Sequence, residues 1–382
     1  MRIRNETPKL GALCRWIRDL DVISGVSLHG NDKANPEGRN RADNLERIHV
    51  VDSILRITGP TDSNFEAADL SVPAPILQKE TWNLHDANGE SYPMRQHVLD
   101  GSIFTQDHNR ETYTSQFRIL ETTPGSQRKP PNQHDAVLYL TSDNSIPLLS
   151  TPPATTTKHP HPHVPHLSLI KDVLHTSECT SLVAACEAIG FLPDAPISDN
   201  GPDASILAHN VYWVIDNAMH DNLWSRVSPF VPKRMGGRKV RGLNRRFRVY
   251  RYVPGASYRA HIDGAWPPSG TIPSTTSPST TGQKYIYDAS PPTGKQSSLF
   301  TFLIYLNDEF TGGETTFFVP SVKEGVLNAY PVKPVMGAVA MFPHGEMGDK
   351  EGPLLHEGTG VREGAKYVIR TEVEYDVEAG LD

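Results

Sequence analysis

From residue 246 onward the sequence is a succession of short apolar runs, each bounded by Gly, Pro or other turn residues. The runs span residues 247–253, 299–306, 315–319, 338–342 and 366–375. Runs of this length are typical of β-strands, whereas a surface helix repeats apolar residues three or four positions apart over a longer stretch. The pattern therefore predicts a mainly β unit, folded as a double-layered barrel or sandwich.

The rest of the chain divides into regions of unequal composition. Residues 1–122 mix short apolar bursts with turn residues, which predicts a β-rich N-terminal region of unknown role. Residues 123–166 are rich in Pro, Ser, Thr and His, so we expect a linker with one strand at 136–141 and an exposed His-rich end. Residues 167–382 hold the apolar runs and form the predicted main domain.

Two helices are expected to flank the β runs at the start of this domain, which makes the predicted fold class α+β. The first begins at Thr176 or Ser177, whose hydroxyl can cap it, and ends before Gly190. The second begins with Asp221 as its cap and ends at Pro229.

Composition and charge argue against several function classes. The longest apolar runs fall far short of the roughly 18 residues that a membrane-spanning helix needs. The first twenty residues lack the apolar centre of a signal peptide, so we expect a cytoplasmic or nuclear protein with no membrane partner. A net charge of −7 argues against nucleic acid as a partner. The oligomeric state stays open.

A cluster of metal ligands is predicted from three residues. His261 and Asp263 lie two positions apart in an extended segment, so their side chains point to the same side. With 16 His in the chain, about one His-x-Asp is expected by chance, so this pair alone is weak. His356, before the final strand, supplies a third ligand. Two imidazoles and one carboxylate form the facial triad of catalytic non-haem iron, which leaves coordination positions open.

A buried cation is expected beside the metal. A dicarboxylate that chelates the metal at one end would place its other carboxylate inside the barrel, where an unpaired charge is costly. Lys366, ten residues after His356, is the first candidate for this contact. Arg370 shares the same strand face and is the competing candidate, and both cations could also belong to an ordinary surface strand.

These motifs resemble the prolyl 4-hydroxylase-like catalytic domain of the 2-oxoglutarate/Fe(II)-dependent dioxygenases. The resembling segments are 248–263, 300–317, 334–344 and 355–375. The resemblance implies a double-stranded β-helix, or jelly-roll, as the catalytic core. It also implies Fe(II) as the metal, 2-oxoglutarate and O2 as cosubstrates, and ascorbate as a reductant.

The resemblance assigns expected roles to further residues. Tyr252 and Thr301 are expected to contact 2-oxoglutarate, although both could equally be core residues of strands. Tyr258 and Trp266 are expected on the substrate side of the metal, although aromatic residues there can also simply line a pocket. The turn at 312–315 matches a family signature that we interpret as structural.

Residues 267–298 interrupt the β pattern with a polar, Pro-rich stretch that is predicted to be a loop. Because this stretch begins four residues after Asp263, we expect it to lie beside the metal. A mobile lid there would exclude water once the substrate binds.

The resemblance implies hydroxylation of an unactivated C–H bond, coupled to decarboxylation of 2-oxoglutarate to succinate and CO2. Three functions stay open from the sequence. The substrate is a peptidyl residue, most naturally proline; or it is a small metabolite; or the barrel is a non-catalytic binding module. The complete ligand set, together with Lys366, argues against the binding module.

Overall fold

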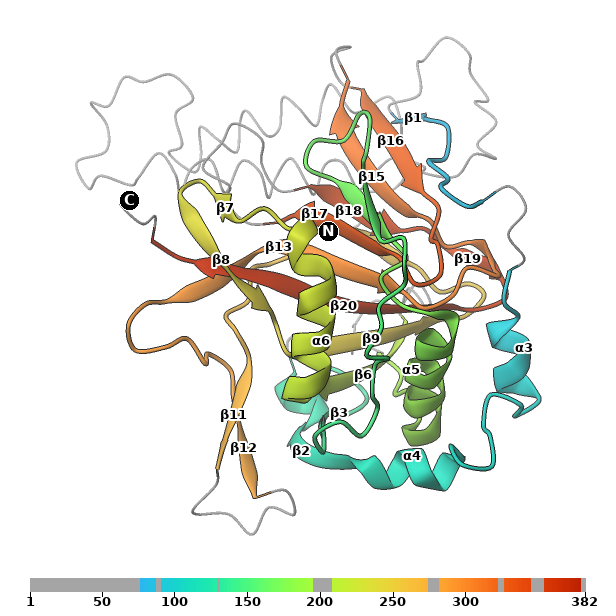
Figure 1. Ribbon diagram of the computed structural model, residues 1–382. Helices are drawn as coiled ribbons and strands as arrows, with labels where there is room; N and C mark the ends of the chain where they lie inside the picture. Colours follow the sequence, from blue (N-terminus) through green and yellow to red (C-terminus); the bar gives the residue numbers. More distant parts are fainter. Residues whose placement is uncertain are drawn as a thin grey trace.

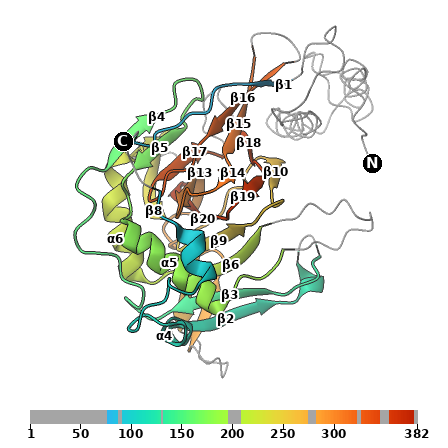
Figure 2. The same cartoon turned by 90° about the vertical axis from the view of Figure 1, so that its right-hand side faces the viewer.

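Two β-sheets face each other in the computed structural model, and helices cover the outer face of the larger sheet (Figures 1 and 2). The structure describes residues 76–86, 91–128, 131–194, 208–273, 282–321, 326–344 and 354–378. This architecture confirms the predicted fold class, a mainly β double-stranded β-helix with flanking helices. The apolar bursts of the sequence before residue 76 lie outside the described residues.

The larger sheet runs in the order β2-β3-β6-β9-β20-β13-β17-β5-β4, with β8 paired to β20 and β7 paired to β8. Its strands are β2 (Phe117–Thr123), β3 (Ala136–Thr141), β4 (Thr157–Pro160), β5 (Ser168–Lys171), β6 (His209–Val214), β7 (Arg234–Met235), β8 (Arg238–Leu243), β9 (Arg246–Tyr252), β13 (Gln296–Tyr305), β17 (Val339–Pro343) and β20 (Lys366–Asp376). The five apolar runs predicted as strands contribute four of these strands and one strand of the smaller sheet.

The smaller sheet has the order β1-β16-β15-β18-β10. Its strands are β1 (Ile76–Gln78), β10 (Tyr258–His261), β15 (Thr315–Pro320), β16 (Leu327–Val332) and β18 (Leu355–Gly358). A short pair, β14 (Thr311–Gly312) with β19 (Val361–Glu363), lies outside both sheets. The helical elements are α3 (Met94–Leu99), α4 (Arg110–Gln116), η2 (Gly125–Gln127), α5 (Thr176–Ile189), α6 (Asn217–Val227) and η4 (Ser228–Phe230).

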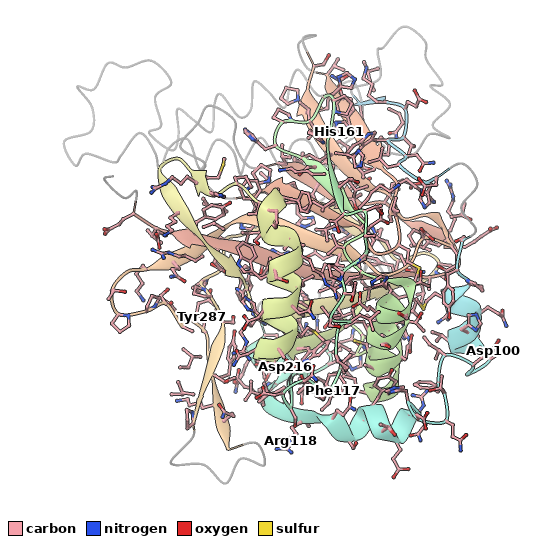
Figure 3. All side chains as sticks on the ribbon, viewed as in Figure 1. Asp100, Phe117, Arg118, His161, Asp216 and Tyr287 are labelled. Carbon is pink, nitrogen blue, oxygen red and sulfur yellow. The ribbon has the colours of Figure 1, made fainter. Side chains whose placement is uncertain are left out.

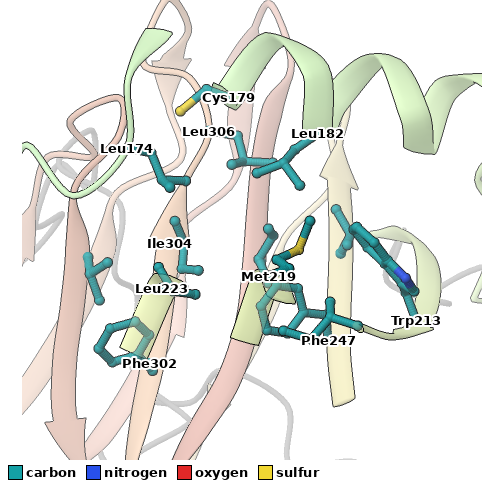
Figure 4. Packing of buried hydrophobic residues seen from close by; sticks show 14 of the residues in the cluster. Leu174, Cys179, Leu182, Trp213, Met219, Leu223, Phe247, Phe302, Ile304 and Leu306 are labelled. Atoms are coloured by element: carbon teal, nitrogen blue, oxygen red, sulfur yellow. The ribbon is translucent and has the colours of Figure 1, made fainter. Parts of the chain in front are cut away.

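Strand side chains divide between two cores because successive residues of a strand point to opposite faces. In β9, Phe247 belongs to the cluster beneath the helices, whereas Tyr252 belongs to the cluster between the sheets. Leu182 of α5 and Leu223 of α6 pack in the first cluster with Phe247 and Phe302 (Figure 4). The helices therefore support the larger sheet from one side and leave its inner face to line a site.

Helix α5 ends as predicted, at Gly190, whose φ of +86° suits a residue without a side chain. Its start differs from the prediction. Thr176 and Ser177 lie inside the helix, and the backbone N–H of His175 donates to the Glu178 carboxylate at 2.8 Å. The Glu178 side chain therefore satisfies the start of the helix that a hydroxyl was expected to cap.

Helix α6 begins one turn earlier than predicted. Its cap is Asp216, whose carboxylate accepts from the Met219 N–H at 2.9 Å, so the choice of Asp221 as the cap is wrong. Arg226 of this helix forms a fully buried ion pair with Glu178 of α5 at 2.8 Å. This pair joins the two helices that cover the sheet.

The predicted linker at 123–166 is folded onto the domain rather than extended. Strand β3, which the sequence predicted, runs parallel to β6, and β4 pairs with β5. His161, labelled in Figure 3, was expected to be exposed. It is instead buried edge-on against the rings of Trp82 and Tyr330. Aromatic packing of this kind gives a Pro- and His-rich segment the buried surface that its composition alone does not predict.

The predicted loop at 267–298 contains a β-hairpin. Strands β11 (Gly270–Pro273) and β12 (Gln283–Ile286) are antiparallel, and they project from the two sheets with β12 in contact with β2 (Figure 1). The loop prediction is therefore wrong for these eight residues and for residues 296–298, which begin β13, because backbone pairing needs no apolar run. Residues 274–281 lie outside the described residues.

In the part of the chain that the structure describes, no helix has the length and apolar character required to cross a bilayer.

Candidate metal centre

Strands β10 and β18 bring two imidazoles together. His261 is the last residue of β10, His356 lies in β18, and the two residues are direct partners in the antiparallel register. Asp263 follows two residues after His261, just beyond the strand. The predicted ligands, although far apart in sequence, therefore meet at one point of the smaller sheet.

The three side chains are close enough to share one ion. Their candidate ligand atoms lie within 4.8 Å of one another. Asp263 Oδ1 lies 3.3 Å from His261 Nε2, and Asp263 Oδ2 lies 3.6 Å from His356 Nε2. The side chain of His261 is 28% exposed while the other two are buried, so the cluster opens on the His261 side. Among the described residues, this is the only such cluster of His, Cys, Asp or Glu.

Hydrogen bonds determine which nitrogen of each imidazole is free. His261 Nδ1 lies 2.7 Å from the Arg259 carbonyl oxygen, and His356 Nδ1 lies 3.1 Å from the Leu354 carbonyl oxygen. A carbonyl only accepts, so each Nδ1 carries the proton and each Nε2 keeps a lone pair for a cation. Burial, assisted by the nearby His261, lowers the pKa of His356 to about 3, which keeps this ring neutral.

Asp263 stays ionised although it is buried. Burial raises its pKa, but the positive charge of Arg370, the neighbouring His356 and the contact with His261 together lower the pKa well below its ordinary value. Arg370 Nη2 lies 3.2 Å from Oδ1, and Thr301 Oγ1 donates to Oδ2 at 2.6 Å. Each carboxylate oxygen therefore has one protein partner in addition to an imidazole.

Lys366 places an ammonium in aromatic surroundings at the start of β20. Its Nζ donates to the Gly313 carbonyl at 2.8 Å and lies 5.6 Å and 5.5 Å from the ring centroids of Tyr252 and Tyr305. Burial lowers the pKa of Lys366 to about 7. Within the described ranges no carboxylate lies within 4.0 Å of this ammonium, although the charge of Glu314 opposes the effect of burial on its pKa, so an incoming anion would not have to displace an ion-pair partner.

The lysine and the metal cluster share the space between the sheets. The Tyr305 hydroxyl forms a 2.9 Å hydrogen bond with Thr315. Thr315 pairs with Gly358, which lies two residues after His356 in β18. The residues around Lys366 therefore include a residue of β15, and β15 is the direct neighbour of β18, the strand that carries His356.

The two residues expected to contact 2-oxoglutarate lie at different ends of this space. Tyr252 is the register partner of Lys366. Thr301 contacts Asp263, and its partner on β20 is Glu372, six residues and thus about 20 Å along the strand from Lys366. The structure brings Tyr252 to the lysine but not Thr301.

Aromatic residues border the exposed side of the cluster. The ring centroid of Tyr258 lies 4.3 Å from that of His261. The Trp266 ring packs against the guanidinium of Arg246 at 4.6 Å and against Tyr287, an exposed residue of the insert, at 5.6 Å (Figure 3). Tyr258 thus lies beside the first imidazole and Trp266 at the root of the insert, and their role on the substrate side of the metal stays a prediction.

Some polar residues of the site were not expected from the sequence. Tyr305 and Thr315 lie beside Lys366, and Tyr305 could have been found because it shares a strand face with Thr301. His344 is buried with its Nδ1 2.7 Å from Thr301 Oγ1. It follows β17 and has no local signal, since its partners come from another strand.

The glycine turn has a structural role at this site. Gly312 has a φ of +74°, and a Cβ there would lie 2.4 Å from the Gly360 carbonyl oxygen. Only glycine fits such a position without displacing backbone. The next residue, Gly313, presents the carbonyl that binds Lys366, so the turn positions the cation.

One family matches the chain. Residues 247–371 match the sequence model described as the 2OG-Fe(II) oxygenase superfamily. This range contains the three clustered residues and Lys366. A search of curated proteins found no match.

Solved structures with detectable similarity include three prolyl hydroxylases. The viral collagen prolyl hydroxylase of Paramecium Bursaria Chlorella virus-1, in complex with 2-oxoglutarate, is 18% identical over 56% of this chain and 97% of its own, with a TM-score of 0.35. A Pseudomonas putida prolyl-4-hydroxylase is 17% identical over 55% of this chain and 91% of its own, with a TM-score of 0.31. A Trichoplax adhaerens prolyl hydroxylase, in complex with a hypoxia inducible factor peptide fragment, is 16% identical over 55% of this chain and 83% of its own, with a TM-score of 0.35. TM-scores below 0.5 do not establish a shared overall fold, so the assignment depends on the family match and on the site.

Proposed function

We propose that the domain whose residues 247–371 match the 2OG-Fe(II) oxygenase superfamily is a dioxygenase that hydroxylates an unactivated C–H bond. In this reaction 2-oxoglutarate is converted to succinate and CO2, and ascorbate serves as the reductant that keeps the metal in its active state. The observation that carries the proposal is the meeting of two imidazoles and a carboxylate with a buried lysine nearby.

The donor set fits Fe(II). His261 and His356 each direct an unprotonated Nε2 toward the cluster, and Asp263 adds an ionised oxygen. These three residues would hold the ion, which would supply the positions that bind O2 and 2-oxoglutarate. The carbonyl partners of both Nδ1 atoms hold the rings in the tautomer that a metal requires.

Lys366 is proposed to bind the C5 carboxylate of 2-oxoglutarate, with Tyr252 and the Tyr305 hydroxyl beside it. Arg370 competes for this role, but its guanidinium lies 3.2 Å from Asp263. The two cations are four residues apart on β20, which separates their backbones by about 13 Å. A carboxylate at the far end of the cosubstrate needs the cation away from the metal ligand, and this favours Lys366.

A peptidyl proline is the proposed substrate, and a small metabolite is the alternative. The ring of Tyr258 lies against His261 on the exposed side of the cluster, Trp266 follows three residues after Asp263, and aromatic faces suit a saturated five-membered ring. The insert at 267–298 is proposed to cover the bound substrate and exclude water, with the hairpin β11–β12 as its described part. A non-catalytic binding module is disfavoured because every ligand and Lys366 are present.

Succinate formation from labelled 2-oxoglutarate tests the proposal. We expect slow turnover with Fe(II) and ascorbate, loss of turnover in His356→Ala, and no change in the control His108→Ala, an exposed histidine outside the cluster. Peptide and metabolite pools should then be screened by mass spectrometry for a gain of one oxygen. Turnover that is absent with every supplement, or that survives in His356→Ala, would refute the assignment.

A further inference from the structure

A continuous series of hydrogen bonds joins Asp263 to the root of the insert. Thr301 Oγ1 lies 2.6 Å from Asp263 Oδ2 and 2.7 Å from His344 Nδ1. On its other side, His344 Nε2 lies 2.8 Å from Ser298 Oγ, which accepts from the Trp266 backbone N–H at 2.9 Å. These five residues come from β13, from the segments after β10 and β17, and from the start of the insert.

Each hydrogen bond in this series has only one possible donor. The ionised carboxylate of Asp263 can only accept, so Thr301 must donate its single hydroxyl hydrogen to it. The Thr301 oxygen then accepts from His344, which places the imidazole hydrogen on Nδ1. Neutral His344 consequently accepts at Nε2 from the Ser298 hydroxyl. The Ser298 oxygen, in turn, accepts from the Trp266 amide.

The surroundings keep His344 in this form. Burial lowers its pKa to about 4, so the ring is neutral at physiological pH. Ser298 and Thr301 have no exposed surface, and His344 is 4% exposed. Water therefore cannot replace a member of the series, and removing one leaves buried polar atoms without partners.

The insert leaves and re-enters the barrel at the last member of the series. In addition to the bond between the Trp266 N–H and the Ser298 hydroxyl, the Ser298 backbone N–H donates to the Trp266 carbonyl at 2.9 Å. Trp266 and Ser298 thus form a clamp that closes residues 267–297 into one loop-like unit. The orientation of the Ser298 hydroxyl, which half of this clamp needs, is dictated by His344.

We infer that His344 is a positioning residue that links the carboxylate ligand Asp263 to the clamp at Trp266 and Ser298. His344 is linked to Asp263 through Thr301, and it bonds directly to the clamp at Ser298. The inference rests on the proposed function only in taking Asp263 as a metal ligand. Because coupling between two sites is reciprocal, metal binding should tighten the clamp, and an intact clamp should raise metal affinity. A residue that merely fills space in the core would lower stability without creating this link.

Hydrogen exchange of the full-length protein, with and without Mn(II), tests the link. In the wild type we expect Mn(II) to slow exchange of the Trp266 amide by about tenfold or more. In His344→Leu and Thr301→Val the slowing should disappear, and the dissociation constant for Mn(II) should rise about 10- to 100-fold, the range for outer partners of metal ligands. His344→Gln and Thr301→Ser are the matched controls, since both keep a donor and an acceptor, and they should largely retain the wild-type response.

Ser298→Ala separates the two ends of the series. It removes the link to Trp266 but leaves the bonds among Asp263, Thr301 and His344, so exchange at Trp266 should become insensitive to Mn(II) while affinity falls less than in Thr301→Val. If His344→Leu fails to fold, this variant and the two conservative ones decide the question. Unchanged slowing at Trp266 in Ser298→Ala, or unchanged Mn(II) affinity in Thr301→Val, would overturn the inference. Failure of the proposed function would look different, because the wild type itself would then bind no Mn(II).

Discussion

Replacing Lys366 with Met should stabilise the metal-free protein at neutral pH and weaken 2-oxoglutarate binding. The ammonium is 4% exposed, it lies between two tyrosine rings, and its one hydrogen-bond acceptor is a backbone carbonyl. A Met side chain of similar length can fill the same space without a charge. The variant therefore removes the cost of burying a cation and, at the same time, the partner of the cosubstrate.

The size of the stabilisation follows from the pKa of Lys366. Burial lowers this pKa from 10.5 to about 7, and a fall of that size corresponds to about 5 kcal/mol of destabilisation in the protonated state. The unfolded chain holds the proton up to pH 10.5, whereas the folded protein releases it near pH 7. The destabilisation is therefore full below pH 7, and it disappears as the pH rises from 7 to 10.5.

Urea unfolding of wild type and Lys366→Met, without metal or cosubstrate, measures this difference. We expect the variant to be more stable by up to about 5 kcal/mol at pH 6.5, with the advantage nearly gone at pH 10. Lys239→Met is the control, because Lys239 is an exposed residue of β8 outside the proposed site. A stability difference between wild type and Lys366→Met that does not change with pH would refute the reasoning.

The same pKa governs cosubstrate binding. A carboxylate prefers the protonated lysine, so wild-type affinity for 2-oxoglutarate should be constant below pH 7 and fall about tenfold for each pH unit above it. In Lys366→Met the affinity should be lower by a factor of about 100 near pH 7, as for the loss of one partner of a buried charged pair. Calorimetric titration with 2-oxoglutarate and Mn(II) measures both effects. Affinity that is independent of pH from 6 to 9 would mean that the ammonium is not the partner.

Three further changes test the fold and the metal cluster. Arg226→Met should lower the free energy of unfolding by about 3 to 5 kcal/mol, because it leaves the Glu178 carboxylate buried without its cation; a loss below 1 kcal/mol in urea would contradict this. Gly312→Ala should lower the melting temperature, since its Cβ would meet a backbone oxygen at 2.4 Å, whereas Gly294→Ala, with open space at the Cβ position, should not; equal melting temperatures would contradict this. Mn(II) should raise the melting temperature of the wild type but not of His356→Ala, and an equal rise in both would remove His356 from the ligand set.

Local patterns predicted much of the fold. The apolar runs at 247–253, 315–319 and 366–375 became β9, β15 and β20 within one residue at each end, because strand length, side-chain type and bounding turns act on the same few residues. Gly190 likewise marked the end of α5. The proposed ligands His261 and Asp263 could be predicted for a similar reason, since residues two apart in an extended segment share a face.

Interactions between distant segments were not predictable in this way. The start of α5 was misplaced because Glu178, not a hydroxyl, satisfies the backbone, and Glu178 is in turn held by Arg226, 48 residues later. His161 was expected in solvent, but its burial depends on Trp82 and Tyr330, which come from other parts of the chain. Such contacts exist only once the sheets have formed.

At the site, too, local patterns were predictable from the sequence and contacts between distant segments were not. Lys366 and Arg370 were both candidates from the sequence, and the contact of Arg370 with Asp263 favours Lys366. Thr301 was expected at the cosubstrate, and the register of β13 places its hydroxyl against Asp263. Register between strands is set by the whole sheet, so no motif within one strand reports it.

The pairing of His261 with His356 across two antiparallel strands sets where this domain can tolerate changes in chain length. A single residue added within β10 or β18 would turn one imidazole to the opposite face of the sheet and end metal binding. The stretch from Tyr287 to Lys295, between β12 and β13, has no such restriction, because it takes part in no strand pairing. We therefore expect natural variants of this domain to differ freely in length between these two residues and not at all between Tyr258 and Asp263.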